Sequence, residues 1–90
     1  MIYEVGARRF KNLKALTSCL RTYKNKVPVD EYLNEEDTNF AAEAFKKYGG
    51  FTKVIKRIRV ERWGHLYLRA LCEDNTMPFL SVTNDIRKPT

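Results

Sequence analysis

The chain has 90 residues, of which 43% are hydrophobic and 31% charged, and its formal net charge is +6 at pH 7. A chain of this length makes one small domain with a single core, which excludes an enzyme built from separate cofactor and substrate domains. It contains no apolar run of the roughly 20 residues that cross a bilayer, and its first residues lack the apolar stretch of a signal peptide. We therefore expect a soluble, intracellular, cytoplasmic protein with one domain over residues 1–90 and a loose tail at about 87–90.

Charge is distributed unevenly along the chain. Residues 1–29 carry seven Lys or Arg and one acidic residue. Residues 30–50 carry two Lys and six acidic residues, and residues 51–90 carry eight Lys or Arg and four acidic residues. This pattern predicts an acidic patch and a separate basic surface built from both ends of the chain. Such a surface favours an anionic partner such as nucleic acid, although the same charge also promotes solubility.

The first predicted elements are a strand at residues 2–5, which resumes at 8–10, and a helix from 13 to about 24. Asn12 is suited to cap this helix. Apolar residues recur along it at three- and four-residue spacing, which places them on one buried stripe: Leu13, Leu16, Cys19, Leu20 and Tyr23. The residue before Pro28 is disfavoured in a helix, so the helix ends before it.

A second helix is predicted between Asn34, as its N-cap, and Gly49-Gly50, which end it. Acidic residues in its first turn and Lys46 and Lys47 in its last turn complement the helix dipole. Its buried stripe consists of Phe40, Ala41, Ala44, Phe45 and Tyr48. The acidic patch thus has a local structural explanation that needs no metal or catalytic role.

Alternation of apolar and polar residues predicts three strands between Val54 and Val82. A three-residue loop, Trp63-Gly64-His65, would pair Val60 with Leu68 and Ile58 with Ala70, whereas a two-residue loop would place Ile58 opposite Arg69. A tight turn at Asp74-Asn75 would set Ala70 opposite Phe79 and Leu68 opposite Ser81. The predicted core face is Val54, Ile58, Val60, Leu66, Leu68, Ala70, Cys72, Met77 and Phe79. The opposite face presents Lys53, Arg57, Arg59, Tyr67, Arg69 and Leu80, together with Ile55.

The order β-α-α-β-β-β predicts a two-layer α+β domain, in which an antiparallel sheet of about four strands packs one face against two helices. Cys19 and Cys72 lie far apart, and His65 is the one histidine, so neither a zinc site nor another metal or cofactor site is expected. Both cysteines are expected to face the core as reduced thiols.

Several segments resemble the DCL domain family, named after the plant phenotype "defective chloroplasts and leaves", over about residues 6–86. The resemblance rests on Gly6 with Phe10 and the following helix, on NEEDTNFAAEAFKKYGG, on Lys53 with KVIKRIRV, on the apolar strand at 66–71, and on LSVTNDI. The chain differs from the family at Tyr48-Gly49, where His-Pro is usual, and at Leu80 and Val82, where aromatic residues are usual.

This resemblance implies a small α+β domain associated with RNA metabolism, including ribosomal RNA processing in plastids. The plant members of the family carry a transit peptide, and we expect none in this chain. A short free-standing member is of the kind that a bacteriophage would encode.

The first functional hypothesis is non-catalytic binding of RNA or another nucleic acid. Basic side chains would contact phosphates and Tyr67 would stack on a base; the phosphate-binding residues would be Lys53, Arg57, Arg59 and Arg69. Trp63 would be a second stacking group or a lid over the edge of the core. Arg8, Arg9 and Lys11 would extend the surface if the first strand joins the sheet. The alternative interpretation is a solvated sheet face whose charges prevent edge-to-edge aggregation.

The second hypothesis is a protein-interaction module that docks on a larger machine such as RNA polymerase and modulates it. Its partner-binding residues would include the acidic set Asp30, Glu31, Glu35, Glu36 and Asp37, together with exposed Tyr32, Trp63 and Tyr67. Catalysis is not expected, because His65 has no accompanying nucleophile or carboxylate pair in a recognisable motif.

Overall fold

The computed structural model describes residues 2–82 and residue 86. Its elements are β1 (Tyr3–Val5), β2 (Arg8–Phe10), α1 (Leu13–Thr22), the 3-10 turn η1 (Tyr23–Asn25), α2 (Glu35–Gly49), β3 (Ile55–Trp63), β4 (His65–Cys72) and β5 (Phe79–Leu80). The α+β class and the predicted order of strands and helices are confirmed. The loose tail predicted at 87–90 lies outside the described residues.

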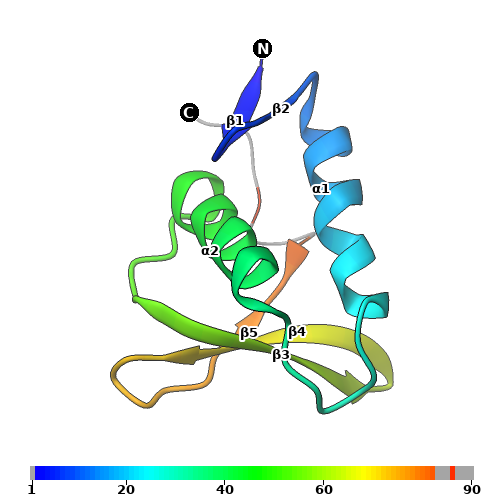
Figure 1. Ribbon diagram of the computed structural model, residues 1–90, viewed down its shortest axis with the longest axis vertical. Coiled ribbons are helices and arrows are strands. Elements are labelled where there is room, and N and C mark those ends of the chain that lie inside the picture. Colours follow the sequence, from blue (N-terminus) through cyan, green and yellow to red (C-terminus); the bar gives the residue numbers. More distant parts are fainter. Residues whose placement is uncertain (1, 83–85, 87–90) are drawn as a thin grey trace.

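The strands of the described part of the chain divide between two antiparallel sheets rather than lying in one sheet of about four. β3, β4 and β5 form one sheet, with both helices on the same side of it, and the β1–β2 hairpin lies at the opposite end of the molecule (Figure 1). The hairpin is separate because Gly6, with φ of 59°, turns the chain back at once, so that Val5 pairs with Arg8. It is held on α2, where the Tyr48 hydroxyl accepts a hydrogen bond from the Glu4 N–H at 2.8 Å.

Both predicted helices form, and their N-caps are confirmed. The Asn12 side chain accepts a hydrogen bond from the Ala15 N–H at 2.8 Å, and the Asn34 side chain accepts one from the Asp37 N–H at 2.7 Å. α1 gives way to η1 slightly before the predicted end of the first helix. Within residues 2–82, neither helix has the length and apolar character required to cross a membrane.

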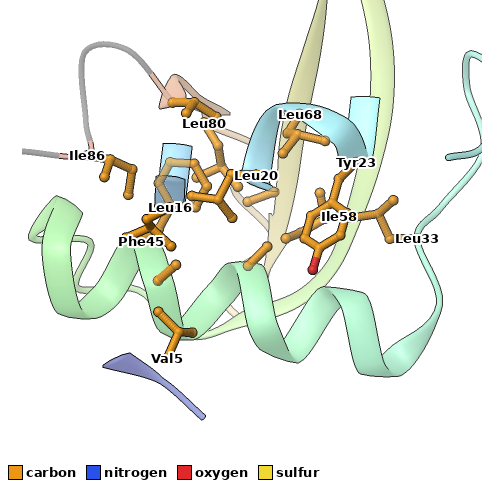
Figure 2. Close-up of a cluster of buried hydrophobic side chains, with 14 of the residues drawn as sticks. Val5, Leu16, Leu20, Tyr23, Leu33, Phe45, Ile58, Leu68, Leu80 and Ile86 are labelled. Carbon is orange, nitrogen blue, oxygen red and sulfur yellow. The ribbon is translucent and has the colours of Figure 1, made fainter. Parts of the chain in front are cut away.

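The core lies between the helices and the inner face of the β3–β4–β5 sheet (Figure 2). Leu16 and Leu20 of α1 and Phe45 of α2 are fully buried there, as are the sheet residues Ile58 and Leu68. The stripe residues Leu13, Cys19, Phe40 and Tyr48 are partly buried against the same core. Cys72 is buried, Cys19 is half-buried, and both are free thiols.

Gly50 ends α2 in the left-handed conformation, with φ of 65° and ψ of 20°. A Cβ at this position would meet no atom within 4 Å, so substitution would cost backbone strain and no steric clash. We expect Gly50→Ala to lower the free energy of unfolding by about 1 kcal/mol, and Gly50→Asn to lower it less, because asparagine tolerates this conformation. Urea denaturation of both variants measures the difference, and equal losses would contradict a conformational cause.

The predicted register of the β3–β4 hairpin is confirmed. Val60 pairs with Leu68 and Ile58 with Ala70, across a tip that contains Gly64 at φ of 78°. The prediction was wrong at the start of β3, where a bulge between Ile55 and Arg57 reverses the alternation. Ile55 therefore packs on the core, and Val54 is 60% exposed.

The predicted register between β4 and β5 was wrong by one residue. Leu68 pairs with Leu80 and Arg69 with Phe79, because the turn after Cys72 holds three residues, 73–75, instead of two, and Asn75 adopts the left-handed conformation at φ of 68°. The Cys72 N–H donates to the Thr76 carbonyl at 3.0 Å and closes this loop. A slip of one residue exchanges the two faces, so Leu80 is fully buried and Phe79 is 45% exposed.

Candidate nucleic-acid interface

The outer face of the sheet, which points away from the helices, carries alternating residues of β3 and β4 and one residue of β5. Arg59 lies opposite Arg69, Glu61 lies opposite Tyr67, and Arg69 also lies opposite Phe79. We call this surface, with Tyr32 beside it, the aromatic–arginine face: Tyr32, Arg57, Arg59, Glu61, Trp63, Tyr67, Arg69 and Phe79.

Tyr32 reaches the face because the connection between the two helices pairs with the edge of β3. The Val60 N–H donates to the Glu31 carbonyl at 3.0 Å, and the Leu33 N–H donates to the Ile58 carbonyl at 2.8 Å. The Arg57 guanidinium lies 3.7 Å from the centroid of the Tyr32 ring, in cation–π geometry. The connection thus adds a fourth aromatic ring to the face and holds Arg57 against it.

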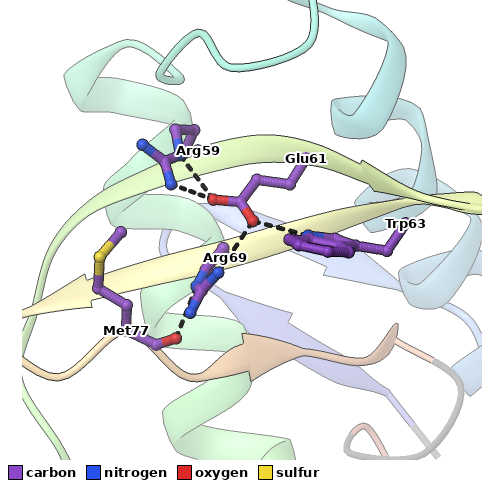
Figure 3. Close-up of polar contacts among 5 residues, drawn as sticks. All are labelled: Arg59, Glu61, Trp63, Arg69 and Met77. Carbon is purple, nitrogen blue, oxygen red and sulfur yellow. Dashed lines mark hydrogen bonds and ion pairs between the residues drawn. The ribbon is translucent and has the colours of Figure 1, made fainter.

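A buried carboxylate lies at the centre of the face. Glu61 is 4% exposed, and both of its carboxylate oxygens accept hydrogen bonds (Figure 3). Oε2 accepts from Arg59 Nε at 2.7 Å and from Arg59 Nη2, while Oε1 accepts from Trp63 Nε1 at 2.9 Å and from Arg69 Nη1 at 3.1 Å. Arg69 Nε in turn donates to the Met77 carbonyl at 2.8 Å. Glu61 therefore fixes the positions of two guanidinium groups and one indole ring.

The electrostatics of this cluster keep Glu61 ionised. Burial alone would raise the pKa of Glu61, but the hydrogen bonds from Trp63, Arg59 and Arg69 outweigh it and lower the pKa to about 2. The pattern of basic residues in the sequence does not reveal Glu61, although Glu61 alternates in step with Arg57 and Arg59. The charge of the face is consequently smaller than predicted.

An apolar hollow lies beside the carboxylate and is lined by Trp63, Tyr67, Arg69 and Phe79. Trp63 is 63% exposed, so it is not a lid over the core. The Phe79 ring centroid lies 6.4 Å from that of Trp63 and 5.7 Å from that of Tyr67, and the Arg69 guanidinium lies 4.6 Å from it. The ring planes of Trp63 and Phe79 are inclined at 87° to each other, so the two rings do not stack face to face. A ring face therefore remains available for stacking with another ring.

Other residues predicted for this interface lie elsewhere. Lys53 precedes β3, and its Nζ lies 3.2 Å from Asp74 Oδ2. Arg8 and Arg9 belong to the separate β1–β2 hairpin, so they do not extend the face: Arg8 covers the Phe40 ring at 5.0 Å, and Arg9 pairs with Glu4 at 2.8 Å. Leu80, predicted on the outer face, points into the core.

The acidic set predicted for a protein partner is divided by the structure. Glu35, Glu36 and Asp37 occupy the first turn of α2, and Asp37 also pairs with Lys26 at 2.9 Å. Asp30 and Glu31 instead lie where the connection pairs with β3. Glu35, Glu36 and Asp37 therefore complement the helix dipole at the start of α2, and backbone groups of Asp30 and Glu31 join the connection to the sheet.

The described residues hold no group of three or more His, Cys, Asp or Glu side chains that could bind a metal ion. His65 is exposed at the start of β4, beside the hairpin tip.

No family model matches the chain, and no curated protein sequence matches it. The chain is similar to the solution NMR structure of an uncharacterized protein from Rhodospirillum rubrum, with a TM-score of 0.78 and 17% sequence identity, over 93% of this chain and 86% of that one. At this level of identity the likeness shows a shared fold. The resemblance to the DCL family therefore stays a prediction.

Proposed function

We propose that this protein is a non-catalytic RNA-binding domain of the cytoplasm and that RNA lies on the aromatic–arginine face. The observation that carries the proposal is the pair of exposed rings, Trp63 and Phe79, beside Tyr67 and Arg69 on an open antiparallel sheet. Sheet-borne aromatic residues stack on the bases of RNA in several known modules, and each stacked base contributes about 1–3 kcal/mol. The resemblance to the DCL family favours RNA, and a role in RNA processing, over DNA.

Within this proposal the aromatic rings contribute most of the affinity. Trp63 and Phe79 stack on bases, and Tyr67 lines the hollow between them. Arg57 is the main phosphate contact, because Arg59 and Arg69 are committed to Glu61. Each phosphate contact contributes about −0.7 to the slope of log K against log salt for a single strand.

The second candidate is a protein-interaction module that docks on a larger machine such as RNA polymerase. Exposed Trp63 and Phe79 also favour this function, because large aromatic residues dominate the binding energy of protein interfaces. The two candidates therefore compete for the same face, and a binding experiment separates them.

Trp63 is the one tryptophan in the chain, so its fluorescence reports directly on the face. We expect a short single-stranded RNA to quench it at low salt, and Phe79→Ala, which keeps the reporter, to weaken binding by about 5- to 150-fold. Ile2→Ala is the matched control, since it removes an exposed apolar side chain from the opposite end of the molecule and should leave binding unchanged.

A charge variant tests the phosphate contact. We expect Arg57→Gln to reduce the salt slope by about one contact, and Arg9→Gln, which removes the same charge from the separate hairpin, to leave it unchanged. If the folded domain neither binds RNA nor changes its fluorescence at low salt, the RNA-binding proposal is wrong and the docking module takes its place.

A further inference from the structure

We propose that Glu61 is the specificity-determining residue of the aromatic–arginine face: it makes the face select single-stranded RNA and reject ligands that offer only phosphate charge. The inference rests on the proposed RNA-binding function. It concerns the class of ligand that the face accepts.

Two arginines of the face are already paired with a carboxylate. Glu61 accepts hydrogen bonds from both Arg59 and Arg69, and Arg69 is further held by the Met77 carbonyl. Each guanidinium keeps N–H donors that do not contact Glu61, but the buried carboxylate offsets one of the two positive charges. A phosphate that displaced the carboxylate would also have to break charge-assisted bonds, which are among the stronger bonds in proteins. A polyanion therefore finds a weak site here, in spite of three arginines on one face.

Glu61 also orients the aromatic rings of the face. The indole N–H of Trp63 donates to Glu61 at 2.9 Å, and the Arg69 guanidinium that Glu61 holds lies over Phe79 at 4.6 Å. Glu61 thus positions both rings that stack on bases, directly for Trp63 and through Arg69 for Phe79. The stacking energy requires no reordering of these side chains on binding.

Duplex and single-stranded RNA present different groups to such a face. In an A-form duplex the base faces are stacked on one another, so a duplex presents phosphates and hydroxyl groups to a protein surface. An unpaired segment presents base faces as well. A protein face that has ordered aromatic rings and little available positive charge therefore favours single-stranded RNA over duplex RNA.

The test compares three probes at neutral pH: a short single-stranded RNA, a duplex of the same sequence, and inorganic polyphosphate. We expect the wild type to bind the single strand about tenfold or more tightly than either other probe. In Glu61→Gln the amide nitrogen cannot accept a hydrogen bond, so either Arg59 or the pair Trp63 and Arg69 loses its acceptor, and the negative charge that offsets the two guanidinium groups is lost. Polyphosphate and duplex should then bind more tightly, the single strand less tightly, and the preference should fall to about threefold or less.

Glu73→Gln is the matched control, because it removes the same charge from an exposed loop and should leave the preference unchanged. Glu61→Asp separates the two effects: the charge remains while the reach shortens, so single-strand affinity should fall with no gain for polyphosphate. The indole N–H resonance of Trp63 should move in both Glu61 variants and stay in place in Glu73→Gln.

The outcomes distinguish the two proposals. If the wild type does not bind the single strand, the proposed function fails. If the wild type binds it and Glu61→Gln keeps the same preference, or Glu61→Asp gains polyphosphate affinity, the function stands and the role of Glu61 is wrong.

Discussion

Replacement of Phe45 by alanine is expected to lower the free energy of unfolding by about 3–5 kcal/mol. Phe45 of α2 is fully buried in the core cluster, which also contains residues of α1 and of the β3–β4–β5 sheet (Figure 2). The substitution removes apolar surface from the core and leaves a cavity that the surrounding helices and strands fill only in part. Because small domains are stable by only about 5–15 kcal/mol, this loss is a large part of the total.

Urea denaturation followed by circular dichroism measures the effect, and Phe79→Ala is its control. Both variants remove the same ring, but Phe79 is 45% exposed, so its loss should cost about 1 kcal/mol or less. The comparison also tests the register of β5, because the sequence pattern placed Phe79 in the core. A loss at Phe79 as large as that at Phe45 would contradict the structure.

The helices could be predicted from the sequence because their signals are local. Asn12 and Asn34 cap the helices through side-chain bonds to residues three positions along, and Gly50 supplies the left-handed residue that ends α2. The buried stripes follow from the helical period, which does not depend on the rest of the fold. Where local signals agree, as in α2, the prediction was confirmed.

The register of the sheet could be predicted only where the sequence indicates the length of the turn between two strands. The tip at Gly64 fixes the pairing of β3 with β4, and that register was confirmed. The left-handed conformation of Asn75 and the bulge near Ile55 each add one residue that the alternating pattern does not reveal. A shift of one residue in register places every side chain of a strand on the opposite face of the sheet. Phe79 therefore lies at the surface and Leu80 in the core, the reverse of the prediction.

The candidate site was predicted in its location but not in its chemistry. Arg57, Arg59 and Tyr67 lie on the outer face as expected, while the neutralising role of Glu61 depends on distances across strands that the sequence does not encode locally. Tyr32 joins the face through backbone pairing of a connection that has no strand pattern of its own. Both additions change a basic surface into an aromatic one with limited free charge.

Acid is expected to destabilise the domain between about pH 4.5 and pH 2, through Glu61 above all. The pKa of Glu61 falls from an ordinary 4.5 to about 2 in the folded state. Between these values the unfolded chain binds more protons than the folded one, so the free energy of unfolding decreases as the pH falls. The contribution of Glu61 is fully present above pH 4.5 and is lost as the pH approaches 2. It amounts to at most about 3 kcal/mol, and to less where solvent screens the arginines.

Urea denaturation at a series of pH values measures this loss, with Glu61→Gln as the test and Asp74→Asn as the control. Hydrogen bonds from the Thr76 hydroxyl and N–H, assisted by Lys53, hold the pKa of Asp74 at about 2, so this exposed carboxylate titrates in the same range. We expect Glu61→Gln to be less stable than the wild type at neutral pH and to lose less stability on acidification, so that the two proteins converge near pH 2. Asp74→Asn should retain most of the acid sensitivity. A carboxylate whose pKa is lower in the folded state than in the unfolded state loses its contribution to the free energy of unfolding when it is protonated. If Glu61→Gln kept the same acid profile as the wild type, the Arg59–Glu61–Arg69 cluster would therefore add nothing to stability.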